Sequence, residues 1–192
     1  MPVLRLDTDR LILRRFEKND SDMKALYLLL GDEEVNTFLP WFPVKDMEET
    51  TDFYEKRFAD REYSLAICMK DDNYPIGYVT VETEGSYDFG YAIRKEFWHR
   101  GIVTEAGKAL IGQLKLDSIP YITATHDKNN PRSGGVMRQI GMKYCYSYEE
   151  YWQPKNIPVT FRMFQLNLDG QEDRVYRGYW NLYDVHFIER DI

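Results

Sequence analysis

The stretch Asp88–Ala106 constrains the fold of this chain most, because it reads as a strand, a short loop and a helix in direct succession. On the strand, bulky side chains alternate with small ones, so one face is large and the other lets a ligand approach closely. The bulky set is Tyr87, Phe89, Tyr91 and Ile93, and the small set is Asp88, Gly90 and Ala92. A helix that begins directly after Gly101 leaves its first backbone N–H groups unpaired, which makes a general anion site.

An apolar stripe follows Gly101 and predicts that this helix packs on a sheet. Its residues recur at spacings of three and four, as expected for one face of a helix. They are Val103, Ala106, Gly107, Leu110 and Leu114.

The sequence Trp-His-Arg-Gly-Ile-Val-Thr-Glu-Ala at positions 98–106 resembles the cofactor loop of the GNAT acetyltransferases, and in particular the RimJ/RimL branch that acetylates ribosomal-protein N-termini. Gly101 takes the family's glycine position, while Trp98 and Val103 depart from its usual Gln/Arg and Gly/Ala. In the family, main-chain N–H groups of this loop hold the pyrophosphate of acetyl-coenzyme A. The resemblance therefore implies a cofactor-binding loop made of Trp98, His99, Arg100, Gly101, Ile102, Val103 and Thr104.

A second motif follows in the family's order, with Asn130 and Ser133 ahead of a short helix and Gly141. By resemblance, Asn130 holds the pantetheine amides, and the backbone of Tyr91, Ala92 and Ile93 pairs with the cofactor like an added strand. Many family members protonate the leaving thiolate with a tyrosine, but Met137 occupies that position here. Ser133 is the replacement candidate, and its alternative role is a hydrogen bond to coenzyme A or to the helix start.

Three carboxylates are candidates for the general base that deprotonates the amine. Glu82 and Glu84 share a face of one strand, and Asp88 lies on the small face of the next. Carboxylates at this place act through water in the family, which selects Asp88 and Glu82 as catalytic candidates. Either one also fits a simple edge or surface charge.

The segment 35–43 is rich in proline and aromatic residues and lies where the family binds its acceptor. Phe38, Trp41 and Phe42 are therefore predicted to bind substrate, or else to close the core. The implied function is acetyl transfer from acetyl-coenzyme A to a protein N-terminal amine or a small amine. A GNAT fold that binds coenzyme A and a protein partner without catalysis is the alternative.

The order of elements predicts an α/β (α+β) GNAT fold, with a mixed, mostly antiparallel, twisted sheet of about seven strands and helices on both faces. A first strand is expected over 8–16, and the domain spans 1–168. The extension 169–192 is aromatic, and Tyr176, Tyr179, Trp180 and Tyr183 fit a short helix. It should pack on its own domain or on a second copy, as a monomer or a homodimer.

Composition fits one domain in the cytoplasm. The chain has 192 residues, of which 43% are hydrophobic, and lacks an apolar run long enough for a membrane span. The opening residues lack the pattern of a signal peptide. The net charge of −7 disfavours nucleic acid and suits a cationic acceptor, or simply solubility. Cys68 and Cys145 have no metal spacing, so no metal is expected.

Overall fold

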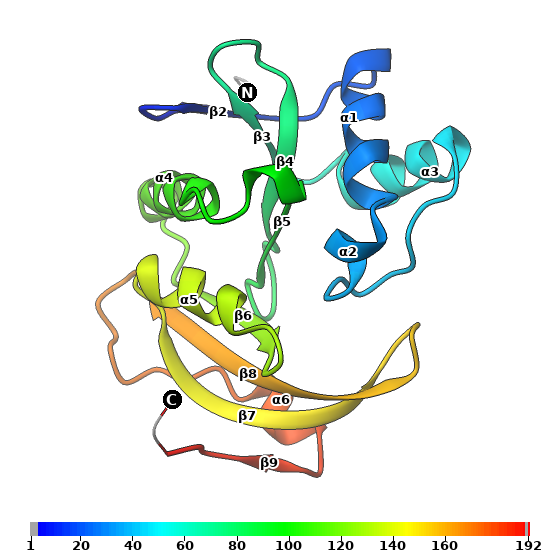
Figure 1. Ribbon diagram of the computed structural model, residues 1–192. Coiled ribbons are helices and arrows are strands. Elements are labelled where there is room, and N and C mark those ends of the chain that lie inside the picture. The colour runs from blue at the N-terminus through cyan, green and yellow to red at the C-terminus, as the bar shows by residue number, and fades with distance from the viewer. Residues whose placement is uncertain (1–3, 191) are drawn as a thin grey trace.

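The computed structural model describes residues 4–190 and residue 192, so the first three residues of the expected domain and Asp191 of the extension lie outside the described part. The strands form two sheets (Figure 1). The first sheet is antiparallel and runs in the order β1 (Arg5–Asp7), β2 (Leu11–Arg14), β3 (Tyr63–Met69), β4 (Pro75–Val81) and β5 (Phe89–Ile93). The second runs in the order β6 (Tyr121–Asp127), β8 (Ile157–Asn167), β7 (Lys143–Trp152) and β9 (His186–Phe187).

The helices begin and end at residues that the sequence marks clearly. Asn19 caps α1 (Asp20–Leu30) and Gly31 ends it, while Asp46 caps α3 (Met47–Arg57). The remaining helices are α2 (Glu33–Asn36), the 3-10 turn η1 (Lys95–Phe97), α4 (Ile102–Leu116), α5 (Pro131–Gln139) and α6 (Gly178–Leu182).

The predicted fold class is confirmed, but the expected single sheet is divided in two. The sheets touch at a parallel bridge between Asp88 and Thr123, where the Thr123 N–H donates to the Tyr87 carbonyl at 3.2 Å. Beyond that point β5 and β6 diverge, and the gap between them leaves one edge of β5 without a neighbouring strand.

The prediction of one first strand over 8–16 was wrong at its start, and the strand number was too low. A turn at Thr8 folds β1 back on β2, because the Thr8 N–H donates to the Leu11 carbonyl and the Leu11 N–H donates to the Thr8 hydroxyl. The extension contributes β9, which pairs with Ser147 and Tyr148 of β7. These two short strands bring the described total above the expected seven.

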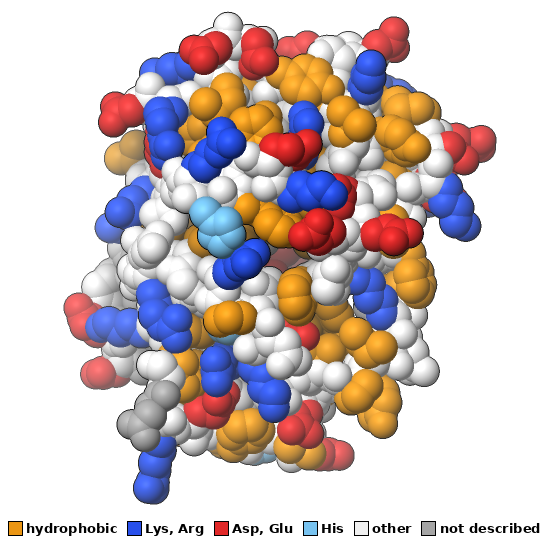
Figure 2. Space-filling view, viewed as in Figure 1, with side chains coloured by type: hydrophobic (Ala, Val, Ile, Leu, Met, Phe, Trp, Pro, Cys, Tyr) orange, Lys and Arg blue, Asp and Glu red, His pale blue; other side chains and the backbone are white. Residues whose placement is uncertain are grey.

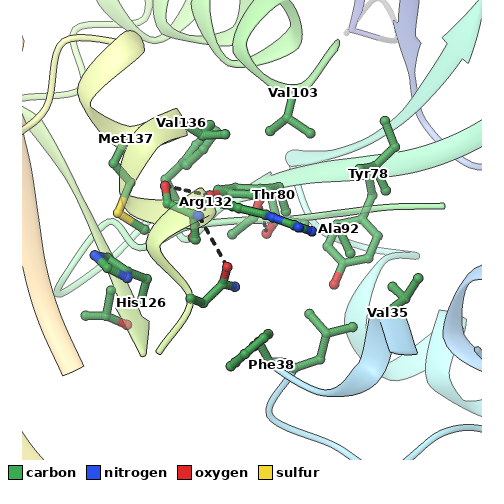
Figure 3. Close-up of a pocket in the computed structure, with 18 of the residues that line it drawn as sticks. Val35, Phe38, Tyr78, Thr80, Ala92, Val103, His126, Arg132, Val136 and Met137 are labelled. Carbon is green, nitrogen blue, oxygen red and sulfur yellow. Dashed lines mark hydrogen bonds between the residues drawn. The ribbon is translucent and has the colours of Figure 1, made fainter. Parts of the chain in front are cut away.

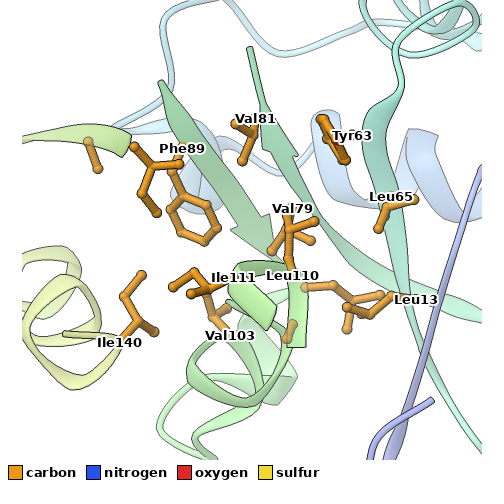
Figure 4. Packing of buried hydrophobic residues seen from close by; sticks show 14 of the residues in the cluster. Leu13, Tyr63, Leu65, Val79, Val81, Phe89, Val103, Leu110, Ile111 and Ile140 are labelled. Carbon is orange, nitrogen blue, oxygen red and sulfur yellow. The ribbon is translucent and has the colours of Figure 1, made fainter. Parts of the chain in front are cut away.

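Two apolar clusters cover the faces of the first sheet. One includes Val79 and Phe89 of the sheet, Leu110 of α4 and Ile140 after α5 (Figure 4). The other joins the opposite face to α1 and α3 through residues such as Leu26 and Tyr54. The helices therefore fix β5 from both sides, and with it the start of α4.

The extension packs against the face of the second sheet that is opposite α5 (Figure 1). Tyr146 and Tyr148 of β7 are buried beneath Tyr179, Trp180 and Tyr183. The Arg162 guanidinium donates to the Glu189 carboxylate at 2.6 Å, and this bond lowers the pKa of Glu189 to about 2. Aromatic packing and a partly buried ion pair thus attach residues 176–189 to β7 and β8.

Candidate active site

The gap between the two sheets opens into a cleft of about 1180 Å³. Typical small-molecule pockets hold roughly 300–1,000 Å³, so this one has room for two ligands end to end. Its walls come from β5, the starts of α4 and α5, the β7–β8 hairpin and the segment after α2 (Figure 3). From the outside, charged side chains of both signs surround a hollow in the middle of the face shown in Figure 2.

The open edge of β5 offers alternate main-chain groups to the cleft. Antiparallel pairing turns every second residue toward the partner strand, and here the Glu82 N–H donates to the Asp88 carbonyl and the Arg94 N–H to the Ile76 carbonyl. The groups of Ala92 therefore face β4, in the same register. The main-chain groups of Tyr91 and the N–H of Ile93 face the cleft. Ala92 lines the cleft through its side chain only, which corrects the expectation that its backbone pairs with the cofactor.

The start of α4 presents unpaired N–H groups to the same cleft. Gly101 has φ +68°, a left-handed conformation that glycine adopts without strain. The first helical bond runs from the Glu105 N–H to the Gly101 carbonyl at 3.0 Å, so the N–H groups of 102–104 have no acceptor within the helix. The Val103 side chain is 7% exposed, packs in the apolar cluster between α4 and the first sheet (Figure 4), and also lines the cleft (Figure 3).

The loop before α4 is fixed by side chains on both ends. The indole N–H of Trp98 donates to the Ile93 carbonyl at 2.9 Å. The Glu105 carboxylate accepts from the Thr8 hydroxyl at 2.6 Å and from Arg10 Nε at 2.6 Å, and Arg10 also donates to the Arg100 carbonyl. Trp98 is thus structural as well as cleft-lining. The exposed side chain of Arg100 adds positive charge at the rim, where the exposed His99 also lies.

The start of α5 brings Asn130 and Ser133 to the cleft. The Asn130 side chain caps the helix by accepting from the Ser133 N–H. Ser133 Oγ lies 2.6 Å from the Tyr91 hydroxyl, so the two form a pair of proton-bearing groups beside β5. Burial raises the pKa of Tyr91 to about 12, against the effect of the Ser133 hydrogen bond. Sequence reasoning identified Ser133 but not the side chain of Tyr91.

Asp88 is the least compensated carboxylate of the cleft. Its Oδ1 is buried and has no hydrogen-bond partner among the described residues. Burial, and secondly the nearby charge of Glu82, raise its pKa to about 7. Glu82 itself is half exposed at the rim, where Arg61 donates to both of its carboxylate oxygens. The two candidate bases therefore differ, because one is paired with a cation and the other is free.

The end of the cleft between the segment 35–43 and the β7–β8 hairpin is the one that the family resemblance assigns to the acceptor, and it is called the acceptor end below. Two of the three predicted aromatic residues line it. Trp41 packs on Phe53 with ring centroids 4.8 Å apart, and Phe38 faces the opening (Figure 3). Phe42 is 59% exposed and lies outside the lining, so its contact with substrate stays a prediction.

Sequence reasoning missed the wall supplied by β7 and β8. Tyr148, Glu150, Trp152 and Phe161 all line the acceptor end. The period-two spacing of the three β7 residues was the available signal, since it places them on one face of a strand. Lys155, at the tip of the hairpin, donates to the Asn36 carbonyl at 2.6 Å and closes the cleft against the end of α2.

A family model described as an acetyltransferase (GNAT) domain matches residues 10–143. The chain belongs to the GNAT acetyltransferase family. A curated relative, an uncharacterized N-acetyltransferase p20 from Bacillus licheniformis, is 24% identical over an alignment of 171 residues that covers 84% of this chain and 94% of the relative.

Two solved structures share the fold of this GNAT domain. Spermidine N-acetyltransferase from Vibrio cholerae, in complex with CoA and spermine, has a TM-score of 0.71 at 14% identity, covering 84% of this chain and 97% of that one. RimL, a ribosomal L7/L12 alpha-N-protein acetyltransferase in complex with CoA, has a TM-score of 0.68 at 18% identity, covering 88% and 100%. Identities at this level establish a common fold and leave the acceptor open.

Two further features bear on the chemistry of this GNAT domain. Within the described residues, no cluster of three or more His, Cys, Asp or Glu side chains is arranged to hold a metal ion. Over the same residues, none of the helices combines the length and apolar character that a membrane crossing requires.

Proposed function

We propose that this GNAT domain transfers the acetyl group of acetyl-coenzyme A to a primary amine, either the N-terminal amine of a protein or a small amine. The observation that carries the proposal is the position of Asp88. Its buried, unpaired carboxylate lies in the same cleft as the open edge of β5 and the free N–H groups of α4.

The chain offers a complementary site for each part of the co-substrate, which supplies an activated thioester. The N–H groups at the start of α4 suit the pyrophosphate, with support from His99 and Arg100. The Asn130 side chain suits the pantetheine amides, and the Tyr91 and Ile93 main chain suits strand-like pairing. An N–H of the open β5 edge is suited to bind the thioester oxygen as negative charge develops on it.

Asp88 takes the proton of the amine, directly or through one water molecule. A base with a pKa of about 7 matches an α-amino group, whose reference pKa is ~7.7–8.0, better than a lysine at ~10.4. The proton thus moves from the amine nitrogen to Asp88 Oδ1 as the nitrogen attacks the acetyl carbon. Glu82 is not assigned this role, because Arg61 engages both of its oxygens.

The Ser133 hydroxyl gives a proton to the departing thiolate and takes one from the Tyr91 hydroxyl along their hydrogen bond, and a proton from solvent then restores Tyr91. The resemblance to the RimJ/RimL branch favours a protein N-terminus as acceptor. The fold shared with a spermidine N-acetyltransferase keeps a small amine in consideration.

The test combines a thermal melt with an assay for thiol release over a panel of N-terminal peptides and small amines. Acetyl-coenzyme A at 100 times its dissociation constant stabilises by about 2.7 kcal/mol, or roughly 5–10 °C for a chain of this size. A shift together with thiol release and an acetylated product supports the proposal. A shift without release on any acceptor favours the non-catalytic binding module, and the absence of a shift contradicts both.

A further inference from the structure

One carboxylate at the acceptor end has no role in the chemistry proposed above. Glu150 of β7 lines the cleft and is half-buried. Burial raises the pKa of Glu150, and the nearby hydroxyl of Tyr183, from the C-terminal extension, opposes this rise. No ion pair joins Glu150 to a Lys or Arg side chain anywhere in the described residues. A half-buried carboxylate without a cation is an open position for one.

Two other glutamates of the cleft are already paired with cations, whereas Asp127, within the described part of the chain, accepts only from the Asn129 N–H. Glu34 is paired with Lys95, and Glu82 with Arg61. Asp88 differs from these glutamates, since its Oδ1 is buried and unpartnered. Burial, and then the charges of Glu150 and Asp88, raise the pKa of Tyr148, so both carboxylates lie near this side chain. Asp88 and Glu150 are therefore two carboxylates of the cleft that have no cationic partner among the described residues.

Two aromatic residues, Tyr148 and Trp152, flank Glu150 on the same face of β7. Tyr148 stacks on Tyr179 and on Tyr183, with ring centroids 5.2 and 4.8 Å away. Trp152 packs edge-on against Phe161 at 5.2 Å. The faces of such rings attract ammonium and guanidinium groups.

An ammonium group of the chain itself already lies on this wall. Lys155 Nζ is 5.5 Å from the centroid of the Trp152 ring and donates to the carbonyls of Asn36 and Thr37. The wall thus accommodates one ammonium, and Glu150 supplies the charge for another. The net charge of −7 on the chain also attracts cationic acceptors at long range.

We propose that Glu150, oriented by Tyr183 of the extension, is a specificity-determining residue that binds a second cationic group of the acceptor. The preferred acceptors then carry two positive charges, in a diamine or polyamine or in a peptide whose terminal amine is followed by lysine or arginine. This inference rests on the proposed acetyl transfer, with Asp88 receiving the reactive amine and Glu150 the other cation.

The experiment compares matched acceptors that differ by one positive charge. Putrescine is compared with butylamine, and a peptide beginning Ser-Lys with the same peptide beginning Ser-Ala. Glu150→Gln should raise the KM for the dicationic acceptors about tenfold or more, with little change in kcat, because a charged hydrogen bond is lost. The KM values for butylamine and the Ser-Ala peptide should stay unchanged. Tyr183→Phe, which keeps the ring stack, should act in the same direction but more weakly.

Glu149→Gln is the matched control, because Glu149 neighbours Glu150 on β7 but is exposed and does not line the cleft. Equal effects of E149Q and E150Q, or equal KM values for mono- and dicationic acceptors in the wild type, would overturn the inference while acetyl transfer stands. If neither the monocationic nor the dicationic acceptors produced any thiol release, the proposed function itself would be contradicted. A larger preference for putrescine over butylamine would indicate a small polyamine as acceptor. A larger preference for the Ser-Lys over the Ser-Ala peptide would indicate a peptide.

Discussion

The two ends of the cleft are built in different ways. The cofactor end consists mainly of backbone groups from two short, continuous stretches, β5 to the start of α4 and the start of α5. The acceptor end consists of side chains from three separated segments, the turn after α2, α3 and the β7–β8 hairpin, and the extension packs against the hairpin. Main-chain binding depends on conformation and tolerates side-chain variation, whereas side-chain binding is specific to each chain. With this division, side chains at the acceptor end can change while the backbone groups at the cofactor end stay the same.

The largest expected effect comes from the single carboxylate at the junction of the two ends. Asp88→Asn removes the base but keeps the shape of the residue, and kcat should fall about 10²–10⁴-fold, the usual contribution of general base catalysis. The thermal shift produced by acetyl-coenzyme A should stay as in the wild type. Glu82→Gln, which breaks the ion pair with Arg61, is the control and should lower kcat far less.

The same substitution should change the pH dependence of stability. The pKa of Asp88 is about 7 in the folded protein and ~3.9 when unfolded, so the folded state binds its proton more tightly. The stability from Asp88 is therefore full below pH ~4 and is lost as the pH rises through ~7. The melting temperature of Asp88→Asn should exceed that of the wild type at pH ~8, and the gap should close toward pH ~4. A gap independent of pH would contradict this assignment.

The second largest effect is expected from a substitution that disrupts only the cofactor end of the cleft. Gly101→Val places a β-branched residue at φ +68° and displaces the N–H groups of α4, so affinity for acetyl-coenzyme A should fall roughly a hundredfold, about 2.7 kcal/mol. Titration of the thermal shift measures this. Gly170→Val is the matched control, because Gly170 also has positive φ but lies outside the cleft. It should lower stability and leave the affinity unchanged.

A smaller effect is expected at the proton donor. Ser133→Ala should lower kcat about tenfold, because the Tyr91 hydroxyl remains beside the leaving sulfur and takes over part of the donation. Tyr91→Phe should have a similar effect, and the double variant should lose more than the product of the two. Single-turnover rates report this step directly. Strictly multiplicative effects would show that the two hydroxyls act independently.

The smallest effect is expected from a substitution at the acceptor end of the cleft. Lys155→Met removes the contact between the hairpin and the carbonyls after α2, and the KM for the acceptor should rise about threefold to tenfold, as a charged hydrogen bond is lost. The KM for acetyl-coenzyme A should not change. Lys115→Met, at an exposed position of α4, is the control. An effect on both KM values would mean that the two ends are not separable.

The same division explains what could be predicted from the sequence. Gly101, Asn130 and Ser133 belong to short motifs in which neighbouring residues fix the backbone, so a local pattern was sufficient to bring them to the cleft. Asp88 followed from its place on the small face of β5. Glu150 was missed although the period-two spacing of β7 places it on one face with Tyr148 and Trp152. Lys155 could not be found this way, because its partners, the carbonyls of Asn36 and Thr37, lie more than a hundred residues away in the sequence. The contact of Phe42 with substrate stays a prediction.

The pH dependence of kcat/KM, for the wild type and Asp88→Asn, tests the central claim most directly. The account predicts that kcat/KM of the wild type rises through pH ~7, as Asp88 loses its proton, and again as the acceptor amine deprotonates near ~8. Asp88→Asn should lose the first rise and keep the second. A variant profile that keeps the inflection near pH ~7 would contradict the role of Asp88 and require another base.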